Sequence, residues 1–141
     1  MQLSPHFTLA ELTYSQTAAR EGIDNTPSAE IIENLKITAE LLEQVRAVLK
    51  TPLVITSGYR CLILNRKIGS LDSSAHVQGQ AADFIAPGYG DPYHVCAAIQ
   101  SSGMVFDQLI HEFKSWTHIA WSKTQRKQVL TIDSAGTRFG L

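Results

Sequence analysis

The sequence is poor in cysteine and carries no excess charge of either sign. Cys61 and Cys96 are its two cysteines and no CxxC pair occurs, so neither a disulfide framework nor a thiolate zinc site is expected. The 12 Lys and Arg residues stand against 13 Asp and Glu residues, which leaves a net charge of −1. Nucleic-acid binding through a basic surface is therefore not expected.

Targeting and membrane-spanning segments are also missing. The N-terminal stretch MQLSPHFTLAEL has no basic region followed by an apolar run, and 18 consecutive apolar residues occur nowhere. We therefore expect cytoplasmic synthesis without a signal peptide, and no insertion into a membrane. The length fits a single domain over residues 1–141, with a loose tail at 134–141. The sequence does not indicate the oligomeric state.

What is present favours an α+β fold, a small antiparallel sheet with flanking helices. Apolar residues at spacings of three and four predict a long helix from about 27 to 50, with Thr26 as its cap. Asp91-Pro92 predicts the start of another helix. Strands are predicted at 53–56, 81–85, 105–112, 116–121 and 128–132. The last three follow one another with short connections, which favours antiparallel pairing among them.

The stretch SAHVQGQAADF, residues 74–84, places His76 seven positions before Asp83. Two ligands on one helix would not be seven apart, so the chain must turn back between these residues, and Gly79 permits such a return. A catalytic zinc site takes three protein ligands and leaves a position for water. His76 and Asp83 are candidates for two of them. On spacing alone, an ordinary loop histidine and a surface aspartate are the more common interpretation.

A third ligand would come from another part of the chain. His118 lies in the alternating stretch WTHIAW, where it shares one strand face with Trp116. Glu112 stands six positions earlier at the end of the preceding strand, a suitable place for a general base, although a solvated carboxylate is the simpler alternative. The remaining candidates are His6, His94 and His111.

Together these residues resemble the zinc D-Ala-D-Ala carboxypeptidases of the M15 class. The matching strings are SGYR at 57–60, SxHxxGxAxD at 74–83, and Glu112 followed by WxH at 116–118. Further matches upstream extend the resemblance to roughly residues 5–122, and the chain is most similar to short, phage-associated members. The hedgehog signalling domain shares the fold of this class, so the resemblance implies a hedgehog/DD-peptidase-like fold.

The resemblance implies a zinc metallopeptidase that hydrolyses the stem peptides of bacterial peptidoglycan, as a carboxypeptidase or an endopeptidase. It implies a Zn²⁺ ion as cofactor, with His76, Asp83 and His118 as ligands. Glu112 would be the base that activates water. Arg60 would stabilise the tetrahedral intermediate or bind a substrate carboxylate. The residues expected to contact the substrate are Arg60, Ser74 and Trp116.

One departure from the family pattern leaves alternatives open. Some members have the glutamate three residues before the last histidine, where this chain has Ser115. The wider spacing of Glu112 resembles the hedgehog arrangement, in which the metal site need not be catalytic. A non-catalytic zinc-containing module that binds the cell wall or builds a virion is therefore the second hypothesis, and a metal-free structural domain is the third.

Two further points depend on the resemblance. His111 competes with Glu112 for the role of base, because adjacent residues of a strand face opposite ways. A phage or prophage origin is also implied. The protein would then act on the wall after release by phage lysis, or as part of a virion.

Overall fold

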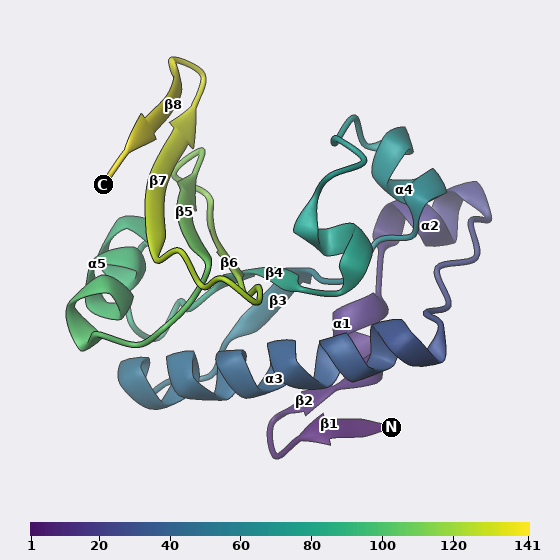
Figure 1. Ribbon diagram of the computed structural model, residues 1–141, viewed down its shortest axis with the longest axis horizontal. Coiled ribbons are helices and arrows are strands. Elements are labelled where there is room, and N and C mark those ends of the chain that lie inside the picture. The colour runs from purple at the N-terminus through teal and green to yellow at the C-terminus, as the bar shows by residue number, and fades with distance from the viewer.

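The computed structural model describes all 141 residues and has an α+β architecture (Figure 1). The helices are α1 (Leu9–Thr13), α2 (Gln16–Glu21), α3 (Ala29–Leu49), α4 (Leu62–Lys67), α5 (Pro92–Ser102) and the 3-10 helix η1 (Ala75–Gln78). The strands are β1 (Gln2–Ser4), β2 (Phe7–Thr8), β3 (Val54–Ser57), β4 (Ala81–Ile85), β5 (Gln108–Glu112), β6 (Trp116–Ala120), β7 (Gln128–Asp133) and β8 (Gly136–Phe139). The predicted mixture of helices and sheet is confirmed.

The long helix α3 forms where the apolar periodicity predicts it, but its cap is different. Ser28 is the N-cap, and its Oγ accepts the amide N–H of Ile31 at 3.3 Å. Thr26 is instead held in the preceding turn, where its amide donates to Asp24 Oδ1 at 3.0 Å. No helix of the chain, α3 included, combines the length and the apolar character that crossing a membrane requires.

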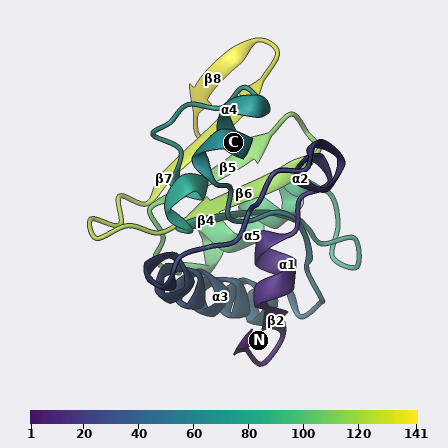
Figure 2. The same ribbon diagram turned by 90° about the vertical axis from the view of Figure 1, so that its right-hand side faces the viewer.

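The main sheet has six strands in the order β3-β4-β6-β5-β7-β8. α3 and α5 pack against each other and against one face of this sheet, and the hydrophobic core lies between them. The sheet contributes Ala82, Phe84, Leu109 and Ile119 to that core. Because side chains alternate along a strand, the neighbouring residues face the other way. α4 and η1 lie on that second side, opposite α3, in both views (Figures 1 and 2).

The expectation of an entirely antiparallel sheet is wrong at β7. β5 and β6 form the predicted antiparallel hairpin, but β7 pairs with β5 in parallel, from Gln108↔Gln128 to Glu112↔Ile132. The reason is that β4 already occupies the other side of β6. The chain leaving β6 must therefore cross to the free side of β5, and it enters that side at the end where β5 begins.

The expected loose tail is also wrong in part, because residues 136–139 form β8. This strand pairs antiparallel with β7, from Leu130↔Phe139 to Asp133↔Gly136. Gly136 has a φ of 117°, which suits a glycine at the hairpin turn. The Arg138 guanidinium pairs with Asp133 across the two strands at 2.7 Å. All four residues of β8 are exposed, and a sequence with so little burial gives no amphipathic signal.

Candidate metal centre

Three elements bring His76, Asp83 and His118 together on the side of the sheet away from α3. His76 comes from η1, Asp83 from β4 and His118 from β6, and all three are buried. Asp83 and His118 are direct partners in the β4–β6 ladder. One nitrogen or oxygen atom from each residue lies within 4.8 Å of the others. The spacing of seven between His76 and Asp83 thus corresponds to a short helix followed by a strand.

Gly79 makes the return between the first two ligands possible. It ends η1 in the left-handed conformation, with a φ of 71°, and its amide donates to the His76 carbonyl at 3.2 Å. A Cβ at this position would lie 3.0 Å from Ile31 Cγ2 and 3.2 Å from the Ile31 carbonyl of α3. Both the backbone conformation and the close approach of α3 therefore favour glycine.

The orientation of His76 fixes which of its ring nitrogens is free. Its Nδ1 lies 2.7 Å from the Gly58 carbonyl, which can only accept, so Nδ1 carries the proton. Burial lowers the pKa of His76 although Asp83 opposes this effect, which favours the neutral ring. The lone pair of Nε2 then faces Asp83 Oδ1 at 3.2 Å. A cation between these two acceptor atoms would remove their repulsion.

The rest of the donor set fits a divalent metal as well. His118 Nδ1 lies 2.8 Å from the same Asp83 oxygen. Burial opposes ionisation of Asp83, but the two imidazoles hold the pKa of this carboxyl well below its usual range. Two imidazole nitrogens and one carboxylate oxygen are a common zinc ligand set, and the Gly58 carbonyl on Nδ1 is the outer hydrogen bond that orients a metal-binding histidine. The residues present therefore fit the ion that the sequence implied.

The strand register separates Glu112 from His111. In the β5–β6 hairpin Ile110 pairs with His118 and Glu112 with Trp116, so Glu112 shares a face with the metal-site histidine. Glu112 Oε1 lies 3.8 Å from His118 Nδ1. Burial, together with the nearby Asp83 carboxylate, raises the pKa of Glu112. A carboxyl group with a raised pKa next to a metal site is suited to proton transfer.

His111 lies on the opposite face of β5, away from the three ligands. Its ring stands 5.9 Å from that of Tyr93 in α5, in an edge-to-face arrangement. Asp91, Pro92, Tyr93 and Lys114 line a small hollow with it. His111 is therefore not within reach of the metal centre. His6 and His94 are likewise separate, each paired with a carboxylate of its own, Glu43 and Asp91.

Arg60 enters the site from the segment that follows β3. Its amide donates to the His76 carbonyl at 3.1 Å. Burial lowers the pKa of its guanidinium, although Asp83 and Glu112 act in the other direction. The Nε atom is buried and has no hydrogen-bond acceptor. A buried donor without a partner is costly, so this nitrogen is set up to bind a group that the protein itself does not supply.

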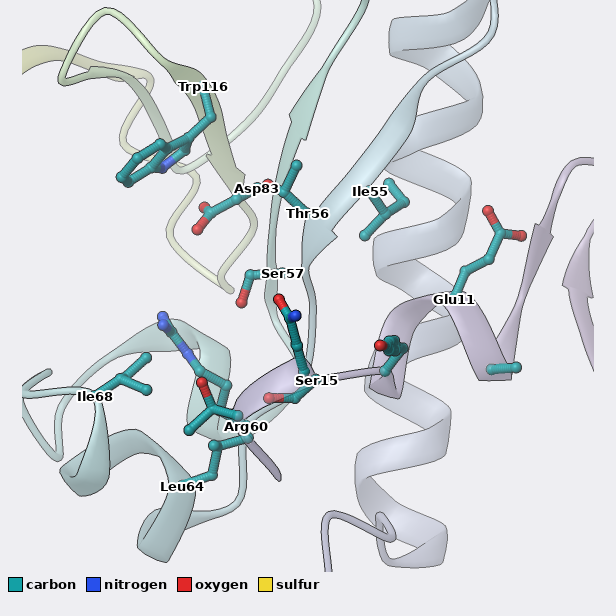
Figure 3. Close-up of a pocket in the computed structure, with 14 residues that line it drawn as sticks. Glu11, Ser15, Ile55, Thr56, Ser57, Arg60, Leu64, Ile68, Asp83 and Trp116 are labelled. Atoms are coloured by element: carbon teal, nitrogen blue, oxygen red, sulfur yellow. The ribbon is translucent and has the colours of Figure 1, made fainter. Parts of the chain in front are cut away.

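A groove of about 870 Å³ leads to the metal centre (Figure 3). Asp83, Arg60 and Trp116 border it on the side of the metal site, and Figure 3 shows the Arg60 side chain extending into the same space as Asp83 and Trp116. The indole Nε1 of Trp116 is a second buried donor without an acceptor. The far wall comes from the N-terminal segment and from α4, with Tyr14, Ser15, Leu64 and Ile68.

Ser74 does not border this groove. Its Oγ instead accepts the His76 amide at 3.3 Å and so caps η1. The sequence interpretation also missed two parts of the site: the Gly58 carbonyl that orients His76, and Asn25, whose amide group bonds to both sides of Arg60. Gly58 lies in the SGYR string, and Asn25 ends the stretch GIDN at 22–25, one of the upstream matches to the family, so the family resemblance was the available signal.

The family described as Peptidase M15 matches residues 5–120. The matched region contains His76, Asp83, His118, Glu112 and Arg60, and it ends at the last residue of β6. No curated protein matches the chain.

Proposed function

The chain belongs to the peptidase M15 family, and from that premise we propose that it is a zinc-dependent peptidase that hydrolyses the stem peptides of bacterial peptidoglycan. One observation carries the proposal: two histidines and one aspartate form a buried group, the aspartate borders a groove, and a glutamate lies beside the group. Catalytic zinc sites use such a set of three ligands and leave a fourth position open. The groove volume of about 870 Å³ is sufficient for a short peptide.

The positions of the side chains support a separate catalytic role for each residue. His76, Asp83 and His118 would hold the zinc ion, and the ion would supply Lewis acidity at this end of the groove. Glu112 moves the proton: its carboxylate accepts one from the attacking water and then donates it to the nitrogen that leaves. The C–N bond breaks, and a carboxylic acid and a free amine remain. The raised pKa of Glu112 suits a group that must accept and then donate.

Arg60 and Trp116 supply hydrogen-bond donors on the metal side of the groove. Both have a buried N–H without an acceptor. Arg60 stabilises the carbonyl oxygen as negative charge develops on it, or it binds a carboxylate of the substrate, and either role uses the same fixed guanidinium. Trp116 contacts the substrate from the same side of the groove as Asp83. Removing an oxyanion donor typically lowers the rate a hundredfold or more, so the rate of Arg60→Ala tests whether Arg60 stabilises the developing negative charge.

The substrate class and the biological setting are carried over from the family resemblance. The bond cut is either the terminal D-Ala-D-Ala bond, as in a carboxypeptidase, or an internal bond of the stem peptide, as in an endopeptidase. A phage or prophage origin gives the protein access to the wall after lysis or from a virion.

The decisive experiment is mass spectrometry of purified muropeptides after incubation with the zinc-loaded protein. We expect loss of a terminal alanine or cleavage inside the stem peptide, and either product identifies the bond. Chelation and the Glu112→Gln variant should both abolish the product. If the wild-type protein carries zinc and binds muropeptides but never cleaves them, the proposal is contradicted. That result would support a non-catalytic module that binds the cell wall.

A further inference from the structure

The segment from Gly58 to Cys61 is held at every residue. The Gly58 carbonyl accepts His76 Nδ1–H at 2.7 Å, and the Tyr59 amide donates to the Leu12 carbonyl at 2.7 Å. The Arg60 amide donates to the His76 carbonyl at 3.1 Å. A Cβ at Gly58 would lie 2.2 Å from the Leu12 carbonyl oxygen, so α1 approaches this segment as closely as a glycine allows.

Asn25 supplies the remaining contacts, from the connection between α2 and α3. Its Nδ2 donates to the Tyr59 carbonyl at 3.0 Å and to the Thr13 carbonyl, at the end of α1, at 2.8 Å. Its Oδ1 accepts the Cys61 amide at 2.7 Å. The amide group of one side chain thus makes three hydrogen bonds, all to backbone, and all of its partners lie at least 12 residues away in the sequence.

The partners of Asn25 are the two peptide groups that meet at Arg60. The Tyr59 carbonyl belongs to the peptide group before the Arg60 Cα, and the Cys61 N–H belongs to the peptide group after it. Fixing both planes fixes φ and ψ of Arg60, and these set the direction in which its side chain leaves the backbone. Cys61 is the N-cap of α4, so its N–H lies outside the hydrogen bonds of the helix, and Asn25 Oδ1 is the acceptor that holds it.

We propose that Asn25 is a positioning residue that aims Arg60 into the groove. It touches neither the groove nor the metal ligands, and it acts only through the backbone on both sides of Arg60. The inference rests on the proposed function as far as the benefit to turnover is concerned. The geometric part, that Asn25 determines where the Arg60 guanidinium lies, is independent of any activity.

The direct test follows the Arg60 Nε–H by NMR hydrogen exchange in the zinc-loaded protein, because this N–H is buried. Asn25→Ala should increase its exchange rate by about tenfold or more, while zinc stoichiometry stays at the wild-type value. Asn34→Ala is the matched control. Its Nδ2 also donates to a backbone carbonyl, that of Gln78 at the end of η1, at 2.8 Å, but no hydrogen bond joins it to the segment from Gly58 to Cys61. An unchanged Arg60 Nε–H in Asn25→Ala would overturn the proposal.

A double-mutant cycle tests the same inference through turnover. Asn25→Ala alone should lower kcat/KM by about tenfold or more, as loss of a positioning hydrogen bond does at other sites. In the Arg60→Ala background, the Asn25→Ala change should lower kcat/KM by less than about twofold, since the two changes remove the same interaction. Asn34→Ala and Arg60→Ala should instead combine additively. An Asn25 effect that persists in full without Arg60 would assign Asn25 a general structural role.

Misfolding of the Asn25→Ala variant and inactivity of the wild-type protein can both be told apart from a failure of the proposal. If Asn25→Ala does not fold, as judged by circular dichroism, Asn25→Asp replaces it; this variant keeps the acceptor for Cys61 but turns an oxygen toward the Tyr59 and Thr13 carbonyls, so the same exchange increase is expected. If the wild-type protein hydrolyses no peptide, the proposed function fails, and the Arg60 Nε–H measurement still decides whether Asn25 positions Arg60.

Discussion

Asp83 balances the charges of the metal centre at the scale of single residues. One of its carboxylate oxygens lies against a nitrogen of His76 and a nitrogen of His118. The two rings stand edge to face, with centroids 5.1 Å apart. Replacing this carboxylate would leave two buried imidazoles facing each other around any cation. Since an unpaired buried charge is costly, we infer that the aspartate is as necessary to the site as either histidine.

Glu112 and His111 offer a paired prediction. Glu112→Gln should keep zinc at wild-type stoichiometry and lose peptide hydrolysis by about a hundredfold or more, because glutamine preserves the shape but cannot accept a proton. His111→Gln should remain largely active, since its ring faces α5 on the far side of the sheet. Initial rates on a muropeptide and metal analysis of both variants provide the measurement. Loss of activity in the His111 variant alone would contradict the strand register, which places Glu112 and not His111 on the face of His118.

The sequence indicated the chemistry of the centre better than its geometry. The motif with His76 and Asp83 could be recognised because the string SxHxxGxAxD resembles the M15 class, whereas the spacing of seven alone favoured an ordinary loop histidine. Which face of β5 is turned toward His118 could not be predicted from the sequence. Glu112 and His111 are both plausible bases, and only the strand register, with Glu112 opposite Trp116, decides between them. The contacts of Asn25 could not be predicted for a different reason: its partners are backbone groups at residues 13, 59 and 61, and its place in a family string does not indicate which backbone groups it binds.

At the scale of elements, α3 joins the two segments that carry the histidines. Thr38 Oγ1, fully buried, donates to the Gly79 carbonyl at 2.6 Å just after η1. The same oxygen accepts Trp121 Nε1–H at 2.8 Å just after β6. One hydroxyl therefore links the chain three residues beyond His76 to the chain three residues beyond His118.

This link predicts a large effect of Thr38→Val. The substitution keeps the shape of the side chain but leaves the Gly79 carbonyl and the Trp121 indole without partners, at a cost of about 1–3 kcal/mol for each group. We expect the free energy of unfolding in urea to fall by roughly 2–4 kcal/mol, and the zinc affinity to fall by about tenfold.

Thr38→Ser is the control for this change. It keeps the hydroxyl and removes one methyl group, so it should cost only about 1 kcal/mol and leave zinc affinity close to the wild-type value. Equal losses in the valine and serine variants would mean that packing of the methyl group, and not the hydroxyl, holds the two segments.

Elements with a strong local signal were predicted well, and those defined by competition for partners were not. The apolar stripe of α3 and the Asp91-Pro92 start of α5 are properties of their own residues, and both helices are present. The pairing of β7 depends on β4 having taken the other side of β6, a long-range fact that a local pattern does not contain. β8 is exposed along its length, so nothing in its hydropathy distinguishes it from a loop.

At the scale of the whole molecule, the metal should also stabilise the fold. The three candidate ligands come from η1, β4 and β6, and they converge only in the folded chain. At free zinc a thousandfold above its Kd, binding adds about 4 kcal/mol, which corresponds to an increase in Tm of roughly 10 °C for a domain of this size. Thermal unfolding with zinc and with a chelator measures this difference.

His118→Ala supplies the control for this measurement, since it removes a ligand from a strand without altering the core face of the sheet. Its Tm should be nearly independent of zinc. A wild-type protein whose Tm is the same with zinc and with chelator, or a His118→Ala variant that keeps the full zinc-dependent increase, would show that the three residues do not hold the ion.

The family match stops at the end of β6, yet the sheet continues beyond it. β7 pairs with β5 along its whole length, so the strand that carries Glu112 is internal. Left open, β5 would present a row of unpaired N–H and C=O groups, the template on which exposed strands of other molecules add and aggregate. Because residues 128–139 add β7 and β8, the exposed edge on this side of the sheet is β8, a short strand far along the sheet from His118 and Asp83. A strand of another molecule that pairs with β8 would not touch the groove.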